Sequence, residues 1–264
     1  MSIFASARYA ELAASLRDDY ARAEPFPHAV IDDFLPPDAA RRVLAEFPDV
    51  GAEWHRYDNA RERKLASRED RHFGPATRAL MHELNALDFL KFLEALTGID
   101  ALISDPRYEG GGLHQIERGG KLGVHADFNH HPLYRLDRRI NVLIYLNEGW
   151  RDEWNGHLEL WDRSMSRCAA KVAPLFNRCV VFNTTDDAFH GHPEPLACPP
   201  GVTRKSLALY YYSNGRPRHE SKGGHSTLFR ERPQDAGGPV AWAVSQARHR
   251  VALTFRKLAR LAEP

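Results

Sequence analysis

The sequence has few cysteines and no long apolar run. Three cysteines in 264 residues cannot supply a disulfide framework, so we expect free thiols in a reducing cytoplasm. No stretch approaches the roughly 18–20 apolar residues that a membrane span needs, so we expect none. The N-terminal residues lack a long apolar core after a basic start, and we therefore expect no secretory signal.

The chain also lacks a charge excess of either sign. Its 36 basic and 35 acidic residues leave a formal net charge of +1. This balance gives no electrostatic reason to expect a nucleic acid or an anionic membrane as the partner. Hydrophobic residues make up 43% of the chain, which is enough for a core of ordinary size and argues against disorder.

The first hundred residues have mainly helical patterns. Apolar side chains recur at helical spacing over the first 24 residues, and residues 26–31 then form a short apolar run typical of a strand. We expect further helices over Ala39 to Phe47, where prolines precede the start, and over residues 75–98. Between these two helices, residues 50–72 are polar and charged, and we expect a mobile loop that is either an ordinary surface loop or a substrate lid.

From residue 101 onward the pattern changes to short apolar or alternating runs separated by Gly, Pro, Asn and Asp. Many short strands at such spacing are typical of a sandwich or jelly roll. The clearest expected strands cover residues 140–146, 157–161, 178–183 and 206–212.

We therefore expect one structural domain that is mainly β with flanking helices (α+β). Residues 1–100 form an N-terminal helical region with one strand, and residues 101–213 form a double-stranded β-helix (jelly roll) core. Residues 214–264 contain a polar loop and a C-terminal amphipathic helix over residues 240–261.

Two candidate metal ligands stand close together in His125-Ala126-Asp127. On an extended chain, positions i and i+2 point to the same side, so the imidazole and the carboxylate converge. A third ligand must come from elsewhere, and the segment Phe189 to Pro193 contains two histidines. We favour His190, with His192 as the alternate. Two histidines and one carboxylate around open positions are the arrangement of non-haem Fe(II) oxygenases.

A cation that suits a chelating cosubstrate follows the third ligand. Arg204 and Ser206 share one face of an expected strand. A guanidinium binds a carboxylate through two parallel hydrogen bonds, and a hydroxyl adds another donor.

At this point the sequence resembles the iron(II)- and 2-oxoglutarate-dependent dioxygenases, in particular their prolyl 4-hydroxylase-like branch. The resemblance covers residues 25–213 and is strongest over residues 113–213. This chain has Gly156-His157 where relatives often have two glycines, and the spacing from His190 to Arg204 is longer than in many relatives. The motifs that carry the resemblance are, in order, His125-x-Asp127, Tyr145-Leu146-Asn147 followed by Trp150, Gly156-x-Leu158-x-Leu160, His190 and Arg204-x-Ser206.

The resemblance implies a hydroxylase that consumes 2-oxoglutarate and dioxygen, releases succinate and CO2, and uses Fe(II), with ascorbate as an optional reductant. It implies that His125, Asp127 and His190 bind the iron. It also implies that Arg204 binds the far carboxylate of 2-oxoglutarate. Further cosubstrate contacts are expected from Tyr145, Ser206 and Gln115. Related halogenases have a small residue at the position of Asp127, so the carboxylate favours hydroxylation.

The sequence leaves the substrate open. Candidate substrate contacts are Asn129, His131 and Arg139, which follow the metal pair closely. The expected substrate is a peptide or protein, as in prolyl hydroxylases. The alternatives are the same chemistry on a small metabolite (an amino acid, a sugar or a lipid headgroup) and a non-catalytic metal-binding β-barrel module. The C-terminal helix packs on the domain or on a second subunit, so a homodimer also stays open.

Overall fold

The computed structural model describes residues 3–67, 70–217, 220, 223–237, 240, 244 and 247. Most of the predicted C-terminal helix therefore lies outside the described residues. The homodimer that this helix would support accordingly stays a prediction. Among the described residues, no helix has the length and apolarity required to cross a membrane.

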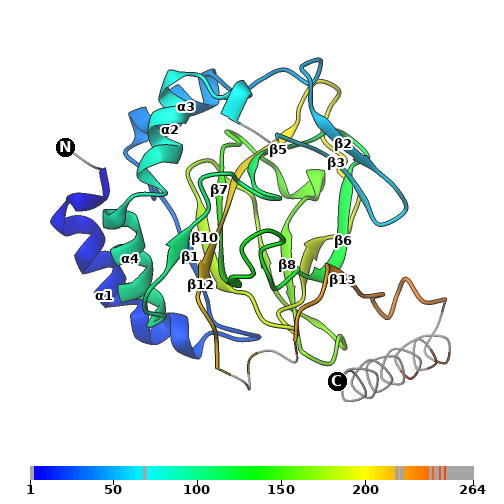
Figure 1. The fold of residues 1–264 in the computed structure, drawn as a ribbon. Helices are drawn as coiled ribbons and strands as arrows, with labels where there is room; N and C mark the ends of the chain where they lie inside the picture. The colour runs from blue at the N-terminus through cyan, green and yellow to red at the C-terminus, as the bar shows by residue number, and fades with distance from the viewer. Residues whose placement is uncertain are drawn as a thin grey trace.

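The four α-helices of the described residues lie along one side of the molecule (Figure 1). Prolines occupy the first turns of α2 and α3, where their missing N–H groups cost no hydrogen bond. α4 ends at Gly98, whose φ of 70° is the left-handed conformation that glycine adopts without strain. The helices are α1 (Ala7–Arg22), α2 (Pro37–Ala45), α3 (Pro75–Glu83) and α4 (Leu87–Thr97), with short 3-10 turns η1 (Ile3–Ala5), η2 (Asp70–His72) and η3 (Asp152–Trp154).

The strands form one antiparallel sheet that curls into a nearly closed, jelly-roll-like barrel, which confirms the predicted fold class. The strand order along the sheet is β1-β10-β7-β12-β5-β3-β6-β11-β8-β9, and β2, β4 and β13 pair at its sides. The strands are β1 (His28–Ile31), β2 (His55–Asp58), β3 (Glu62–Ala66), β4 (Ile103–Ser104), β5 (Gly112–Ile116), β6 (Lys121–Ala126), β7 (Asp137–Tyr145), β8 (Leu158–Trp161), β9 (Cys168–Val172), β10 (Cys179–Asn183), β11 (His190–His192), β12 (Arg204–Ser213) and β13 (Leu228–Phe229).

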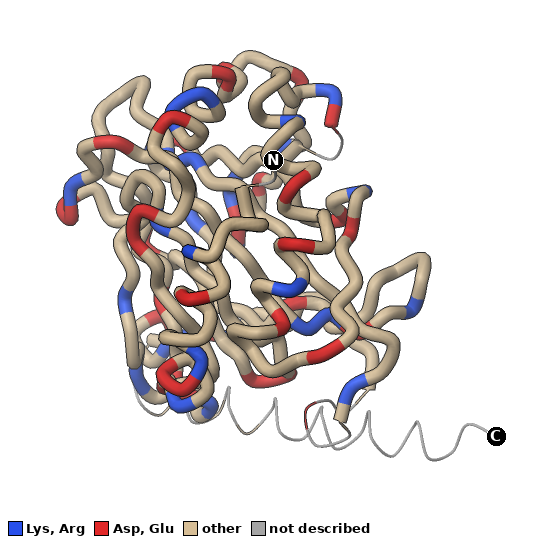
Figure 2. Tube along the Cα trace, turned by 90° about the vertical axis from the view of Figure 1, so that its left-hand side faces the viewer, with Lys and Arg blue, Asp and Glu red and all other residues tan. Residues whose placement is uncertain are grey.

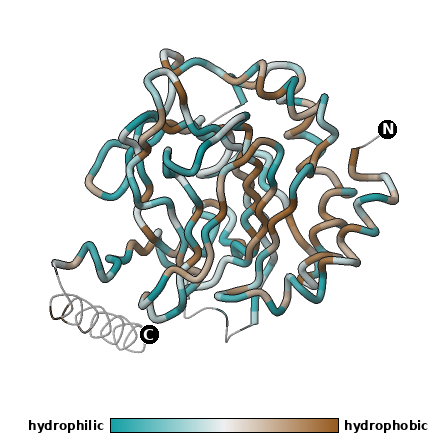
Figure 3. Tube along the Cα trace, turned by 180° about the vertical axis from the view of Figure 1, so that it is seen from behind, coloured by the Kyte–Doolittle hydropathy of each residue, from teal (hydrophilic) through white to brown (hydrophobic). Residues whose placement is uncertain are grey.

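The central strands are buried on both faces, and each face belongs to a different core. On β7, Val142 and Ile144 face the helices and pack with α1 and α4 side chains. The alternate residues Leu143 and Tyr145 face the barrel interior, where Leu160 of β8 also lies. Because successive side chains of a strand point to opposite faces, one continuous apolar strand serves both cores. Figure 3 shows this apolar band through the central strands.

The prediction of a loop over residues 50–72 was wrong. This segment contains a β-hairpin of β2 and β3, and β3 joins the two halves of the barrel sheet. Ala66 pairs with His114 of β5, while Glu62 pairs with Leu122 of β6. The inward residues of this hairpin are polar, so it lacks the apolar alternation by which a half-buried strand is predicted.

The single helix expected over residues 75–98 is two helices, α3 and α4. The break falls at Leu84 and Asn85, whose carbonyls accept hydrogen bonds from the Tyr211 and Ser104 hydroxyls. These side chains satisfy carbonyl groups that a helix end leaves unpaired. The break therefore follows from contacts with β12 and β4, not from a local sequence signal.

Charged residues of both signs are interspersed over the chain (Figure 2). Neither sign dominates the view, in keeping with the balanced composition. We therefore expect the charged residues that take part in function to lie inside the barrel.

Candidate metal and cosubstrate site

Two neighbouring strands bring two histidines together inside the barrel. His125 of β6 pairs in register with His190 of β11, and their ring centroids are 4.5 Å apart. Asp127 follows directly after β6, and its carboxylate oxygens lie 3.5 Å from His125 Nε2 and 3.3 Å from His190 Nε2. One ligand atom from each residue lies within 4.8 Å of the other two, and all three residues are buried.

Backbone carbonyls orient both imidazoles. His125 Nδ1 lies 2.8 Å from the Gly123 carbonyl, and His190 Nδ1 lies 3.0 Å from the Ala188 carbonyl. A carbonyl only accepts, so each Nδ1 carries the proton and each Nε2 presents its lone pair to the centre of the cluster. This tautomer is the one that metal-binding histidines need.

The carboxylate of Asp127 is held in its charged form. Burial alone would raise its pKa, but the Arg138 guanidinium and the two imidazoles lower the pKa well below its ordinary value. Arg138 Nη2 lies 3.0 Å from Oδ2, and Asn141 Nδ2 donates to the same oxygen at 2.6 Å. Burial and the neighbouring His190 lower the pKa of His125, so this imidazole stays neutral. The donor set thus fits a divalent ion that accepts nitrogen and oxygen ligands.

Gly191 allows the two strands to come close. A Cβ on Gly191 would lie 2.8 Å from the carbonyl oxygens of both Leu122 and Gly123. A β-bulge also separates the pairing of His190 with His125 from that of His192 with Leu122. Because of this bulge, His190 lies beside His125 and His192 lies beside Leu122.

A buried cationic group lies deeper in the barrel. Arg204 Nε donates to the Gly156 carbonyl at 2.8 Å, and its Nη2 lies 3.2 Å from the Tyr145 hydroxyl. Burial lowers the pKa of Arg204, while Tyr145 partly offsets this effect. Gly156 has a φ of +79°, and a Cβ there would lie 2.6 Å from Leu196 Cδ2 and 3.1 Å from Arg204 Cδ. A glycine at this position therefore leaves room for the side chains of Leu196 and Arg204.

The side chains around Arg204 come from three paired strands. Ser206 of β12 pairs with Tyr145 of β7 on one side and with His114 of β5 on the other. Paired residues share a face of the sheet, so these side chains lie on the face that carries Arg204. Sequence analysis missed His114, although the strand alternation could have identified it once the face of β5 was known.

Gln115 lies on the other face of β5. It pairs with Lys205 and Leu65, and its Nε2 donates to Thr203 Oγ1 at 2.8 Å. Its predicted cosubstrate contact stays a prediction. Its neighbour His114 points inward instead, and the charge of Arg204 contributes to the lowered pKa of that imidazole.

His192 is buried in the same chamber, but it is not part of the metal-capable cluster found among the described residues. Neither of its ring nitrogens has a hydrogen-bond partner in the described part of the chain, and the same holds for His114 Nε2. Burial, followed by the charges of Arg204 and Lys64, lowers the pKa of His192 well below its ordinary value.

The three predicted substrate contacts are engaged within the protein. Arg139 binds Ser213 Oγ and the Glu220 carboxylate, each at 3.0 Å. Asn129 Nδ2 donates to Asp186 Oδ1 at 3.0 Å. His131 is buried, and its Nδ1 accepts hydrogen bonds from the backbone N–H groups of residues 133 and 134.

Comparisons with known proteins agree with this geometry. Residues 111–212 match a family model described as the 2OG-Fe(II) oxygenase superfamily. No curated protein matches the chain significantly.

Solved structures share the fold. A Pseudomonas putida prolyl-4-hydroxylase is 20% identical with a TM-score of 0.51, over 77% of this chain and 100% of that one. A Trichoplax adhaerens prolyl hydroxylase in complex with a hypoxia-inducible-factor peptide is 17% identical with a TM-score of 0.56, over 78% and 91%. The α-ketoglutarate-dependent epimerase SnoN from nogalamycin biosynthesis is 12% identical with a TM-score of 0.54, over 77% and 84%.

The matched segment contains all the candidate metal ligands and the buried guanidinium. Residues 111–212 therefore match the 2OG-Fe(II) oxygenase superfamily, and the chain has the fold of the prolyl 4-hydroxylases.

Proposed function

We propose that this enzyme hydroxylates an unactivated C–H bond, with Fe(II) held by His125, Asp127 and His190. The observation that carries the proposal is the convergence of these three side chains, with both imidazoles oriented by backbone carbonyls. When bound, ferrous ion together with 2-oxoglutarate and dioxygen supplies the oxidant, and succinate and CO2 are released.

We further propose that Arg204 binds the far carboxylate of 2-oxoglutarate. Its Nε is occupied by the Gly156 carbonyl, which fixes the plane of the guanidinium. Tyr145 and Ser206 lie on the same face and add hydroxyl donors. His114 belongs to this group by its position, whereas Gln115 would act on it indirectly through Thr203.

Apolar side chains enclose this chamber. Leu158, Leu160 and Phe182 line the barrel interior, and the Phe182 ring lies 4.6 Å from the His190 ring. They exclude water from the cosubstrate, which strengthens the charge interactions of Arg204 and Asp127. The predicted reducing cytoplasm suits an oxidation-sensitive ferrous site, and Cys168, Cys179 and Cys198 are all free thiols.

One structural neighbour is a prolyl hydroxylase in complex with a peptide fragment, and another is an epimerase from nogalamycin biosynthesis. We propose a prolyl-hydroxylase-like reaction on a peptide first and hydroxylation of a small metabolite second. The metal-binding module without catalysis is the weaker hypothesis because a structural metal needs no buried guanidinium beside it.

The test is anaerobic addition of Fe(II) and 2-oxoglutarate, followed by oxygen, with ascorbate present. We expect a visible charge-transfer band before oxygen and slow succinate release after it. Asp127→Ala should abolish both signals. A full band in this variant would contradict the assigned ligands.

The same band separates the two candidate distal histidines. His190→Val should lose the band, whereas His192→Val should keep it, because only His190 lies in the cluster with Asp127. The reverse result would assign the metal to His192.

A further inference from the structure

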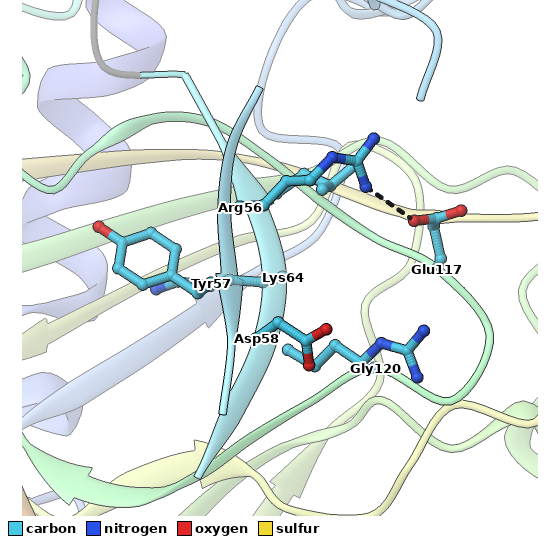
Figure 4. Close-up of a pocket in the computed structure, with 8 residues that line it drawn as sticks. Arg56, Tyr57, Asp58, Lys64, Glu117 and Gly120 are labelled. Atoms are coloured by element: carbon cyan, nitrogen blue, oxygen red, sulfur yellow. Dashed lines mark ion pairs between the residues drawn. The ribbon is translucent and has the colours of Figure 1, made fainter. Parts of the chain in front are cut away.

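The hairpin of β2 and β3 carries a partly buried lysine on the face that it shares with Glu62 and Tyr57. Lys64 is only 13% exposed, and its Nζ lies 3.5 Å from Glu62 Oε2 and 4.8 Å from the centre of the Tyr57 ring. Tyr57 and Lys64 point to one side of the hairpin, whereas Arg56 and Asp58 point to the other (Figure 4). On that outer side Arg56 forms an ion pair with Glu117 beside a cavity of about 80 Å³.

Lys64 lies on β3, which pairs with β5, the strand of His114, on one side and with β6, the strand of His125, on the other. Burial lowers the pKa of Lys64, and the charges of Glu62 and Asp127 oppose this shift. The same ammonium contributes to the lowered pKa values of His114 and His192. The charge of Lys64 therefore interacts with Asp127 and with both inner imidazoles.

A second cation lies on β7, beside the metal ligand Asp127. Arg138 of β7 is 1% exposed, and its guanidinium lies 4.4 Å from the centre of the Phe128 ring and 3.4 Å from that of Tyr210. Nε and Nη2 donate to the Asn141 side chain, and Nη2 also contacts Asp127. Nη1 is buried and has no acceptor among the described residues.

Three cations of the site have fewer carboxylate partners than their number. Among the described residues, Lys64 is paired with Glu62 and Arg138 with Asp127, whereas Arg204 contacts a carbonyl and a hydroxyl but no carboxylate. A ferrous ion and a 2-oxoglutarate dianion would cancel each other, so one positive charge would remain. Buried charges are normally paired, and this imbalance points to a third anion.

We propose that the substrate carries a carboxylate, held between Lys64 Nζ and Arg138 Nη1 next to the C–H bond that is hydroxylated. This inference rests on the proposed function. The carboxylate can belong to a free acid or to an acidic side chain or C-terminus of a peptide. In either case Nη1 of Arg138 gains the acceptor that it lacks among the described residues, and Lys64 adds a second, point-like charge.

The experiment uses full-length enzyme with Fe(II) and 2-oxoglutarate under anaerobic conditions. Probes are acetate, glycine, L-proline, L-glutamate and an acidic peptide, each compared with its amide. Binding is measured from the shift of the charge-transfer band, and the free acids and the peptide distinguish the two sources of the carboxylate. We expect at least one acid to bind about tenfold or more tightly than its amide.

Variants of the hairpin separate this inference from the proposed function. Lys64→Met should keep the band and the 2-oxoglutarate affinity but lose the preference for acids, and Lys64→Arg should restore part of it. Arg63→Met changes the neighbouring residue, which lies on the other face of the strand, and should keep the preference.

Two results would overturn the inference. One is a panel in which no acid binds better than its amide, and the other is an unchanged preference in Lys64→Met. Absence of the band from the wild-type protein would instead contradict the proposed function itself, and the inference with it.

Discussion

At the scale of single residues, the inner chamber contains two buried imidazoles, those of His114 and His192. His114 and His192 both lie close enough to Arg204 and Lys64 to be affected by their charges, and burial is the larger cause of their lowered pKa values. For His114 the pKa falls from its ordinary value of 6.5 to about 3. Neutral imidazoles leave Arg204 free of competing positive charge at neutral pH.

The lowered pKa of His114 predicts a loss of stability in acid. Below the unfolded-state pKa of about 6.5, the unfolded chain binds a proton that the folded chain does not bind until about pH 3. The unfolded state is therefore favoured as the pH falls, by about 2 kcal/mol at pH 5 from this residue alone. We expect urea unfolding of metal-free His114→Gln to depend less on pH between 7 and 5 than that of the wild type.

The control for this comparison is the exposed His82, because His82→Gln should keep the wild-type pH dependence. An equally steep loss of stability in His114→Gln would show that other groups dominate the acid sensitivity.

Arg204 carries a second prediction at this scale. Arg204→Met removes the buried guanidinium with little change in side-chain volume. We expect 2-oxoglutarate to bind at least about tenfold more weakly, because a charge-assisted contact is lost. Calorimetric titration of the protein loaded with a redox-inert divalent metal measures this change. Unchanged affinity would place the far carboxylate elsewhere.

At the scale of elements, close pairing of β6 and β11 positions the ligands. His125 and His190 face each other only because Gly191 lets the backbones approach. Sequence patterns predicted that His125 and Asp127 lie on one side of an extended segment, because the period of two is local, but they did not predict the short strands β6 and β11. They did not predict the hairpin of β2 and β3, because its inward side chains, such as Lys64 and Glu62, line a polar chamber.

Gly191→Ala should disturb this pairing. Its Cβ would lie 2.8 Å from two backbone oxygens, and backbone cannot yield as a flexible side chain does. We expect a loss of about 1–3 kcal/mol in the free energy of unfolding and a weaker charge-transfer band. Thermal unfolding and anaerobic spectroscopy check both effects.

Gly51→Ala is the matched control, because no atom lies within 4 Å of its added Cβ. It should leave the stability and the band unchanged. A Gly191→Ala variant that behaves like this control would show that β6 and β11 can separate without cost.

At the scale of the whole molecule, two cores share the central strands but serve different purposes. One core joins the helices to the outer face of the sheet, and its aromatic centre includes Phe4, Phe34, Phe89 and Phe92. The other fills the barrel around Tyr145 and Leu160. Damage to the first core should reduce stability without altering the metal site.

Phe89→Ala tests this separation. Loss of a fully buried ring should lower the free energy of unfolding by about 3–5 kcal/mol. The anaerobic band should persist below the melting temperature because no ligand lies in this core. Leu87→Ala, which changes a 63% exposed residue of the same helix, should change stability by less than about 0.5 kcal/mol. A band lost from folded Phe89→Ala would show that the cores are coupled.

Local order in the chain was enough to predict the jelly-roll class, the common side on which His125 and Asp127 lie, and the face shared by Arg204 and Ser206. Strand alternation and residue chemistry extend over only a few residues, and neither needs a partner strand to be recognised. Tertiary structure alone decided that His190 faces His125, that His114 and not Gln115 points inward, and that Lys64 enters the barrel. These outcomes depend on register and on the bulge between β6 and β11, because a shift of one residue turns every side chain of a strand to the opposite face.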